Sequence, residues 1–202
     1  MPARTSGNTA SKILDVAERL VQLRGFNGFS YADVAAELKV IKASLHYHFA
    51  GKAELGEALI TRYTRRFADA LAAIEGSDAD ARTALEAYAE LYAEVLRAQR
   101  MCLCGMLAAE YQTLPKPMQA AVIQFFDDNE AWLENVLKKG RDEGTLHFGE
   151  SAREAARLVV SALEGAMLTA RPYGDVERFE AAASALLSSL GAEPAPPVVT
   201  KA

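Results

Sequence analysis

The chain has 202 residues, half of them hydrophobic, so it is long enough to bury a core and to form one large or two small domains. Its net charge of −5 argues against a protein that coats nucleic acid over its whole surface. The charge is uneven, because residues 1–52 hold seven Lys/Arg and four Asp/Glu, whereas the remainder holds 15 and 23. A small basic segment before an acidic body is typical of a protein that presents one end to phosphates, although ordinary surface variation is an alternative.

The sequence shows no pattern for export or for membrane insertion. Residues 1–10 are polar, and no apolar run approaches the roughly 20 residues that cross a bilayer. Two cysteines, Cys102 and Cys104, are too few for a disulfide framework. We therefore expect a cytoplasmic protein with no membrane partner.

The first predicted helix runs from Thr9 to about Arg24. Residues 1–8 are predicted to be irregular, with Arg4 either frayed or serving as an arm that reaches a phosphate or a minor groove. Gly25 is expected to end the helix in a left-handed conformation. Behind it, Phe26 and Phe29 are expected to fill the core between this helix and the next segment.

The stretch from Ser30 to Phe49 has the pattern of two short helices with a tight break between them. Ser30 followed by Asp33 predicts a capping box. The apolar residues then fit two helical turns, and the pattern stops at Lys39. From Lys42 onward Leu45 and Phe49 point inward, while the polar side chains are left to point outward. A short helix that offers a cation, a hydroxyl, imidazoles and a phenol suits a DNA groove. We interpret the stretch as a helix-turn-helix whose recognition helix is 42–48. The candidate DNA-binding residues are Ser30, Tyr31, Lys42, Ala43, Ser44, His46, Tyr47, His48 and Lys52.

At these residues the chain resembles the TetR family of bacterial transcriptional regulators. The matching features are the hydroxyl residue Ser30, the apolar–Ala pair Val34-Ala35, the pair His48-Phe49, and Lys52 three residues later. The chain departs from the family pattern at Lys39, Ile41 and His46, where Gly, Ser and Tyr are usual. The neighbouring Tyr47 can supply the missing phenol.

The resemblance covers roughly residues 9–60, and beyond these only the length and the helical plan agree. It implies a regulator that binds a double-stranded DNA operator as a homodimer and responds to a small-molecule inducer. Such a protein is expected in the cytoplasm, bound to the DNA of the nucleoid.

The rest of the chain is predicted to be helical, which gives an all-α fold of about nine helices. A long helix from Lys52 to about Ile74 is followed by helices near 80–99, 102–112, 117–143, 151–171 and 176–190. Ser151 followed by Glu154 predicts a second capping box, at the start of the 151–171 helix. The predicted domains are 1–51 for the helix-turn-helix, 52–190 for ligand binding and dimerisation, and 191–202 as a loose tail.

The pairing surface is expected on the last two long helices, because their apolar faces are rich in small residues that let helices approach closely. The alternative is that these helices are interior to one chain. The family resemblance favours a four-helix bundle between two subunits. The candidate interface residues are Leu158, Ala162, Leu163, Ala166, Phe179, Leu186 and Leu187.

The middle helices hold most of the aromatic and sulfur-containing residues, which would suit a pocket for a hydrophobic or electrophilic ligand. Plain core packing is the alternative, and only the family resemblance favours the pocket. The candidate pocket residues are Tyr63, Phe67, Tyr88, Tyr92, Cys102, Cys104, Met106, Tyr111, Phe126, Trp132 and Met167.

The Cys102–Cys104 pair fits neither a zinc site nor a disulfide. Zinc needs more ligands than the region offers, and side chains two residues apart diverge in a helix and in a strand. The thiols are either a reactive sensor or two small buried residues that permit close packing.

No phosphate-binding loop, nucleophile elbow or metal-ligand cluster occurs in the sequence, so we predict no catalytic site, cofactor or metal. The predicted function is a DNA-binding regulator, most simply a repressor that its ligand releases from a palindromic operator. The alternatives are a helical adaptor without a DNA target and, more remotely, an enzyme.

Overall fold

The computed structural model describes residues 3–191, with side chains from Thr9 onward. Within these residues the chain forms nine α-helices, two short 3-10 helices and no strand, which confirms the predicted all-α class. None of these helices is both long and apolar enough to cross a bilayer. Residues 192–202, predicted to be a loose tail, lie outside the described residues.

The described residues form two compact units, and the boundary between them passes through three helices. The first unit comprises the described residues up to Ala70 together with Val95–Asp127, and the second comprises Leu71–Glu94 together with the described residues from Asp128. The helices that cross the boundary are α4 (Lys52–Glu75), α5 (Ala81–Arg97) and α7 (Lys116–Asp142). The predicted functional division at residues 51 and 52 stays a prediction.

Helix α1 spans Ala3–Arg24, so the prediction that residues 3–8 are irregular was wrong. The segment lacks an apolar stripe, but extending an existing helix costs far less than nucleating one. Gly25 ends the helix with φ +82°, and its N–H donates to the Val21 carbonyl oxygen over 2.8 Å. Phe26 and Phe29 are buried, as predicted, and their rings pack edge to face.

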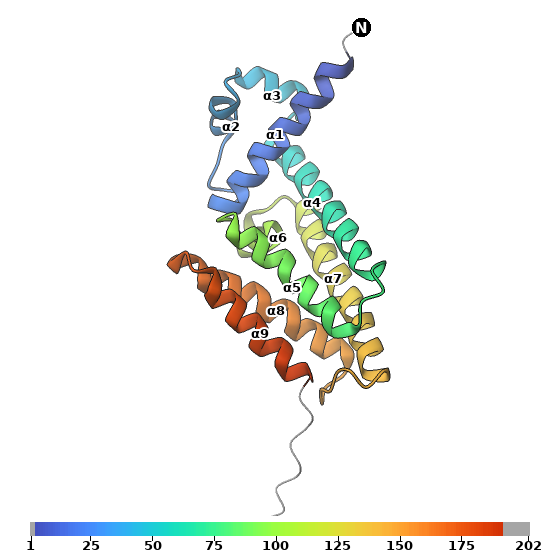
Figure 1. Ribbon diagram of the computed structural model, residues 1–202. Coiled ribbons are helices and arrows are strands. Elements are labelled where there is room, and N and C mark those ends of the chain that lie inside the picture. Colours follow the sequence, from blue (N-terminus) through green and yellow to red (C-terminus); the bar gives the residue numbers. More distant parts are fainter. Residues whose placement is uncertain (1–2, 192–202) are drawn as a thin grey trace, which may run out of the picture. The chain divides into compact units, whose positions relative to one another are not determined.

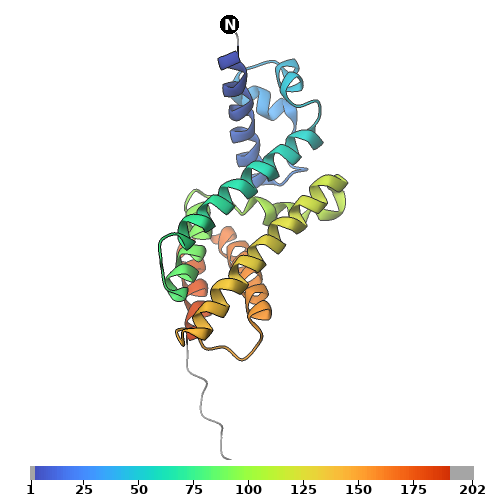
Figure 2. The ribbon, with the colours of Figure 1, turned by 90° about the vertical axis from the view of Figure 1, so that its right-hand side faces the viewer.

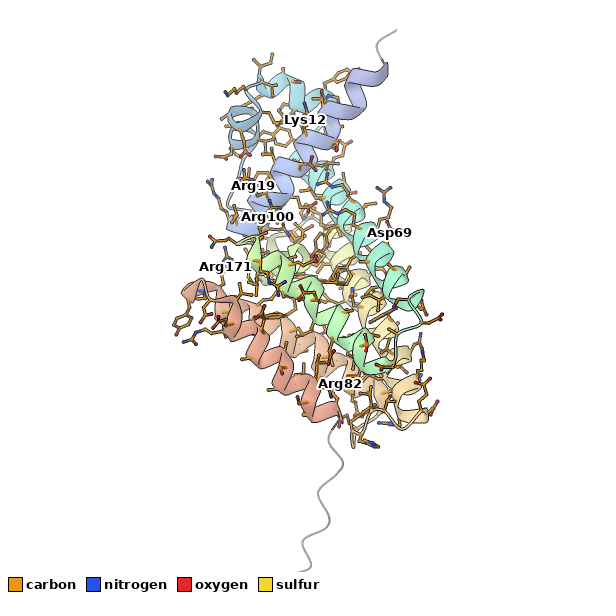
Figure 3. All side chains as sticks on the ribbon, viewed as in Figure 1. Lys12, Arg19, Asp69, Arg82, Arg100 and Arg171 are labelled. Atoms are coloured by element: carbon orange, nitrogen blue, oxygen red, sulfur yellow. The ribbon has the colours of Figure 1, made fainter. Side chains whose placement is uncertain are left out.

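The first unit groups α1, α2 (Tyr31–Leu38) and α3 (Lys42–His48) at the N-terminal end of α4 (Figures 1 and 2). Ion pairs fix α1 on α4: Arg62 Nη2 lies 2.8 Å from the buried carboxylate of Glu18, and Arg66 reaches the same group. Arg19, visible on α1 in Figure 3, pairs with Glu37 of α2. Charged contacts therefore hold a helical group that has only a small core.

Helix α6 (Leu103–Ala109) packs against α1 within the same unit. The residue after α6, Glu110, uses its carboxylate to accept the backbone N–H of Phe26 over 2.5 Å and that of Asn27 over 3.2 Å. The Asn27 side-chain amide also donates to Thr113 Oγ1 over 2.7 Å. Thr113 belongs to the 3-10 helix Tyr111–Thr113. The loop between α1 and α2 is thus held by residues that follow α6, far away in the sequence, as well as by the helices it connects.

A close approach between α4 and α7 requires glycine at position 56. A Cβ there would lie 2.5 Å from Met118 Sδ and 2.9 Å from a ring carbon of Phe26. Both neighbours are buried, so a larger residue would force the Met118 side chain and the Phe26 ring to shift within the core.

In the second unit α8 (Ala152–Ala170) and α9 (Val176–Gly191) lie side by side (Figure 1), joined through the 3-10 helix Arg171–Tyr173. The predicted capping box at the start of α8 is present: Ser151 Oγ accepts from Glu154 N over 3.2 Å, and the Glu154 carboxylate accepts from Ser151 N over 3.0 Å. The Ser151 hydroxyl, which donates to the Glu154 carboxylate over 2.6 Å, and the Ser151 N–H together lower the pKa of Glu154. The loop before α8 is tied to the end of α9, because His147 N donates to the Leu190 carbonyl oxygen over 2.7 Å.

Replacing Glu110 with alanine should destabilise the folded protein by about 1–3 kcal/mol, because the Phe26 and Asn27 N–H groups lose a charged acceptor. Urea denaturation of the variant measures the loss. The control is Glu94→Ala at an exposed position of α5, which should change the free energy of unfolding by less than about 0.5 kcal/mol. Equal effects at the two sites would contradict the assigned role of Glu110.

Candidate nucleic-acid interface

Helix α2 begins at the predicted capping box. Ser30 Oγ accepts the Ala32 N–H over 3.2 Å, while Asp33 Oδ2 accepts from Ser30 N over 2.7 Å and from Ser30 Oγ over 2.6 Å. These hydrogen bonds hold the pKa of Asp33 below its usual value. Ser30 is exposed, yet its hydroxyl is engaged in the cap, so a phosphate contact would require it to exchange partners.

The break between α2 and α3 is a left-handed turn at Lys39, with φ +55°. Val40 N donates to the Ala35 carbonyl oxygen over 3.0 Å, which closes the end of α2. A lysine tolerates this conformation at a cost of about 1 kcal/mol, where a glycine would adopt it without strain. The turn leaves Lys39, Val40 and Ile41 exposed.

Helix α3 is anchored by two apolar side chains and one phenol. Leu45 is fully buried and Phe49, which ends the helix, is 8% exposed. The Tyr31 hydroxyl donates to the Phe49 carbonyl oxygen over 3.0 Å, and its ring lies 4.8 Å from the His46 ring. Burial, with a smaller contribution from Glu54, raises the pKa of Tyr31 to about 12, so this phenol remains a donor. Tyr31, predicted as a DNA contact, therefore ties α2 to α3.

The remaining side chains of α3 are exposed or half-buried. Tyr47 is 80% exposed, with its ring edge-on to that of the half-buried His48 at 5.1 Å. Lys42, Ala43 and His46 are exposed and Ser44 is half-buried. The face predicted to meet DNA is thus accessible, while the contacts of its individual residues stay predictions.

Lys52, predicted to reach a phosphate, points inward in this structure. Its Nζ donates to the Phe29 carbonyl oxygen and lies 4.7 Å and 4.4 Å from the ring centroids of Phe26 and Phe29. Desolvation lowers the pKa of Lys52, partly opposed by the charges of Glu110 and Asp33. The spacing of the sequence placed this lysine at a helix start, but it gave no sign of the two rings that the ammonium covers. Lys52 fastens the α1–α2 loop to α4.

The candidate pocket residues lie in separate clusters. In the first unit Tyr63, Phe67 and Phe125 have neighbouring rings, and the Tyr63 hydroxyl donates to Cys102 Sγ over 3.6 Å. Phe126 adjoins Phe125, whereas Cys104 is buried and both Met106 and Tyr111 are half-buried.

In the second unit Tyr88 stacks on Trp132 at 5.7 Å, and its hydroxyl lies 3.1 Å from that of Tyr92 and donates to Asn129 Oδ1 over 3.1 Å. Met167 of α8 is fully buried. This polar network inside an apolar core was not foreseen, because Asn129 carried no spacing signal.

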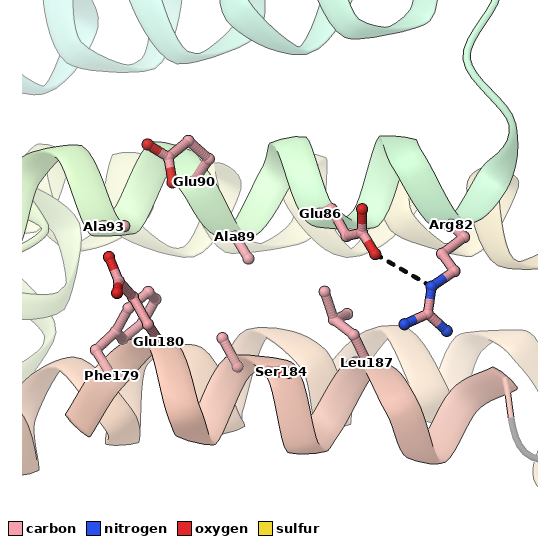
Figure 4. A pocket seen from close by; sticks show the side chains of 10 residues that line it. Arg82, Glu86, Ala89, Glu90, Ala93, Phe179, Glu180, Ser184 and Leu187 are labelled. Atoms are coloured by element: carbon pink, nitrogen blue, oxygen red, sulfur yellow. Dashed lines mark hydrogen bonds and ion pairs between the residues drawn. The ribbon is translucent and has the colours of Figure 1, made fainter. Parts of the chain in front are cut away.

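The described residues of the second unit line a groove and a smaller hollow. A groove of about 230 Å³ runs between α5 and α9 (Figure 4). Its lining includes Ala89 and Ala93 of α5 and Phe179 and Leu187 of α9, together with the acidic residues Glu86, Glu90 and Glu180. A smaller hollow of about 100 Å³ is lined by Trp132 together with Ile74 and Val136. Of the candidate pocket residues, Trp132 borders the second of these hollows.

The candidate dimer residues divide between the interior and the surface of the second unit. Leu163, Phe179 and Leu187 are buried within the chain, so the expectation that they form an intersubunit surface is corrected. Leu158 is exposed, whereas Ala162, Ala166 and Leu186 are half-buried. Helical spacing identified the apolar faces of α8 and α9, but part of each face is buried against other helices of the same chain.

Comparison with known proteins places this geometry among bacterial regulators. Residues 13–59 match the family described as "Bacterial regulatory proteins, tetR family", and residues 81–186 match "Tetracyclin repressor-like, C-terminal domain". The HTH-type transcriptional repressor NemR of Escherichia coli is 26% identical over 186 residues, which cover 89% of this chain and 92% of that protein.

Solved structures give the same result. A TetR-family transcriptional regulator from Agrobacterium tumefaciens has a TM-score of 0.89 and 31% identity, covering 93% of this chain and all of that one. A TetR transcriptional regulator from Legionella pneumophila has a TM-score of 0.79 and 33% identity, covering 91% and 97%.

The two cysteines allow a direct test of the sensor hypothesis, because Cys102 and Cys104 are 1% and 0% exposed. We expect both thiols of the native protein to react with an aromatic disulfide reagent at least about tenfold more slowly than in urea, since attack requires an exposed thiolate. A Ser188→Cys variant, altered at an exposed position of α9, provides an accessible thiol as the positive control. Rapid native reaction of Cys102 or Cys104 would instead favour a thiol sensor.

Proposed function

Because this chain belongs to the TetR family and is a DNA-binding transcriptional regulator, we propose that it represses transcription as a homodimer on a palindromic operator. A small hydrophobic or electrophilic ligand, bound by residues of the 52–190 region, releases it. It acts in the cytoplasm, at the nucleoid.

The observation that carries the proposal is the exposed face of α3. Leu45 and Phe49 are buried and hold the helix on the protein, whereas Lys42 near its start and Tyr47 near its end are exposed to solvent. In a helix-turn-helix the N-terminal residues of the recognition helix meet base edges. We therefore assign Lys42 and Ser44 to base edges, and Tyr47 and His48 to phosphates.

The contacts of α6 suggest how a ligand could act on the helix-turn-helix. Met101 N, just before α6, donates to the Gln22 carbonyl oxygen of α1 over 3.3 Å, and Glu110, just after it, holds the α1–α2 loop. A displacement of α6 would therefore move both the C-terminal part of α1, through Met101, and the α1–α2 loop, through Glu110. This displacement gives one route from the ligand to the recognition helix. A second route is a tilt of the long helix α4, whose N-terminal end lies beside the helix-turn-helix. The ligand shifts the equilibrium only if it binds one arrangement better than the other.

The surface of α8 supports pairing of two chains. Leu158, Ala162, Gly165 and Thr169, the α8 stripe, follow one line along the helix at spacings of four, three and four residues. A Cβ added at Gly165 would meet nothing within 4 Å. A glycine in a helix interior costs about 1 kcal/mol relative to alanine, and no contact among the described residues requires it. Close approach of a second α8 provides the missing reason.

Replacing Lys42 with alanine should weaken binding to the operator by about 1–3 kcal/mol if the ammonium reads a base edge. Fluorescence anisotropy with a duplex selected from random DNA measures the change. Lys138→Ala in the second unit, which removes an exposed lysine of α7, should leave affinity unchanged. An adaptor without a DNA target would show no salt-dependent duplex binding in any variant.

Replacing Gly165 with leucine should convert the dimer to a monomer, because a bulky side chain would separate the two helices. The fold should persist, since leucine favours a helix more than glycine does. Sedimentation velocity measures the oligomeric state, and Arg153→Leu on another exposed face of α8 is the matched control. A Gly165→Leu protein that remains a dimer would exclude the α8 stripe from the interface.

A further inference from the structure

Ile41 is the most exposed aliphatic side chain among the described residues. It lies immediately before α3 and is 74% exposed, compared with 61% for Leu168 of α8 and 49% for Ile123 of α7. A single exposed aliphatic residue needs no explanation on an ordinary surface. This one occupies the position where the recognition helix begins, so its chemistry bears on what that helix meets.

Nothing in the described part of the chain accounts for isoleucine at this position. Ile41 is the N-cap of α3 and makes no side-chain hydrogen bond to the helix. Serine, threonine, aspartate or asparagine would satisfy a backbone N–H there, whereas isoleucine cannot. The chain thus leaves a helix start without a side-chain cap and holds an apolar group in water.

The surroundings of Ile41 fit DNA better than a protein partner. Lys42 follows it directly and Lys39 precedes it by two residues, with the less exposed Val40 between them. Both lysines are exposed, so a partner that covers Ile41 must also accept two cations. Duplex DNA supplies phosphates and acceptor atoms for the lysines. It also presents one exposed apolar substituent in the major groove, the 5-methyl group of thymine.

We propose that Ile41 reads the 5-methyl group of a thymine in each operator half-site. The inference rests on the proposed binding of α3 to an operator and assigns part of the sequence specificity of that binding. Because Lys42 follows directly, the thymine lies within one or two base pairs of the base that the ammonium contacts. Ile41 is a specificity-determining residue, and Lys42 supplies the neighbouring polar contact.

Replacement of single thymines by deoxyuracil tests the contact, because it removes the methyl group and leaves the base pairing unchanged. The duplex is the one that purified protein enriches from random DNA. For the unaltered protein we expect about a fourfold loss of affinity at one thymine per half-site, the effect of burying one methyl group. Other thymines should show no change.

Variants of Ile41, measured on the same two duplexes, test whether this residue is the one that contacts the methyl group. Ile41→Ser should bind the thymine and deoxyuracil duplexes equally, while Ile41→Val should retain most of the difference. Serine is a favoured N-cap, so the Ile41→Ser variant should melt at or above the temperature of the unaltered protein. Ile123→Ser, the same change at an exposed site of α7, should preserve the difference between the two duplexes.

The outcomes separate the inference from the function on which it rests. Equal binding of thymine and deoxyuracil duplexes by the unaltered protein overturns the inference and leaves the DNA-binding function intact. A difference that persists in Ile41→Ser also overturns it, because another residue then reads the methyl group. Failure to enrich any duplex removes the DNA-binding function, and the inference with it.

Discussion

The burial of Leu45 and Phe49 is the constraint on which the exposed face of α3 depends. A helix of seven residues is far too short to be stable alone, so its conformation comes from packing. Leu45 is fully buried, and the Tyr31 hydroxyl holds the backbone of Phe49 at the end of the helix. With these anchors buried, Tyr47 lies in solvent on the side of the helix opposite Leu45, and Lys42 is exposed at the first turn of the helix. The accessible surface is thus a consequence of two buried side chains.

The helix-turn-helix has too little core of its own and is supported by polar contacts from the rest of the first unit. Lys52 covers the rings of Phe26 and Phe29, Glu110 accepts two backbone N–H groups, and Glu18 receives two guanidinium groups. Because Glu110 directly follows α6, the contact that stabilises the α1–α2 loop also links it to a helix of the region proposed to bind the ligand. Stability and ligand response therefore share the same residues in this account.

Local patterns in the sequence predicted the all-α class, the capping boxes at Ser30 and Ser151, and the break at Lys39, because each depends on neighbouring residues. The predictions that were wrong or incomplete concern residues whose contacts lie far away in the sequence. Spacing marked Phe179 and Leu187 as apolar but could not say that their own chain covers them. It placed Lys52 at a helix start without revealing the rings it meets, and it gave no reason to notice Glu110. The residues of the ligand pocket remain a prediction for the same reason.

Selection of binding sites from random duplex DNA with purified protein tests the central claim most directly. Two α3 helices held by one dimer should enrich an inverted repeat whose half-site centres lie one helical turn apart, about 34 Å, or a multiple of it. An enriched palindrome with that spacing is the predicted result. Enrichment of a lone half-site, or of no sequence at all, would contradict the account.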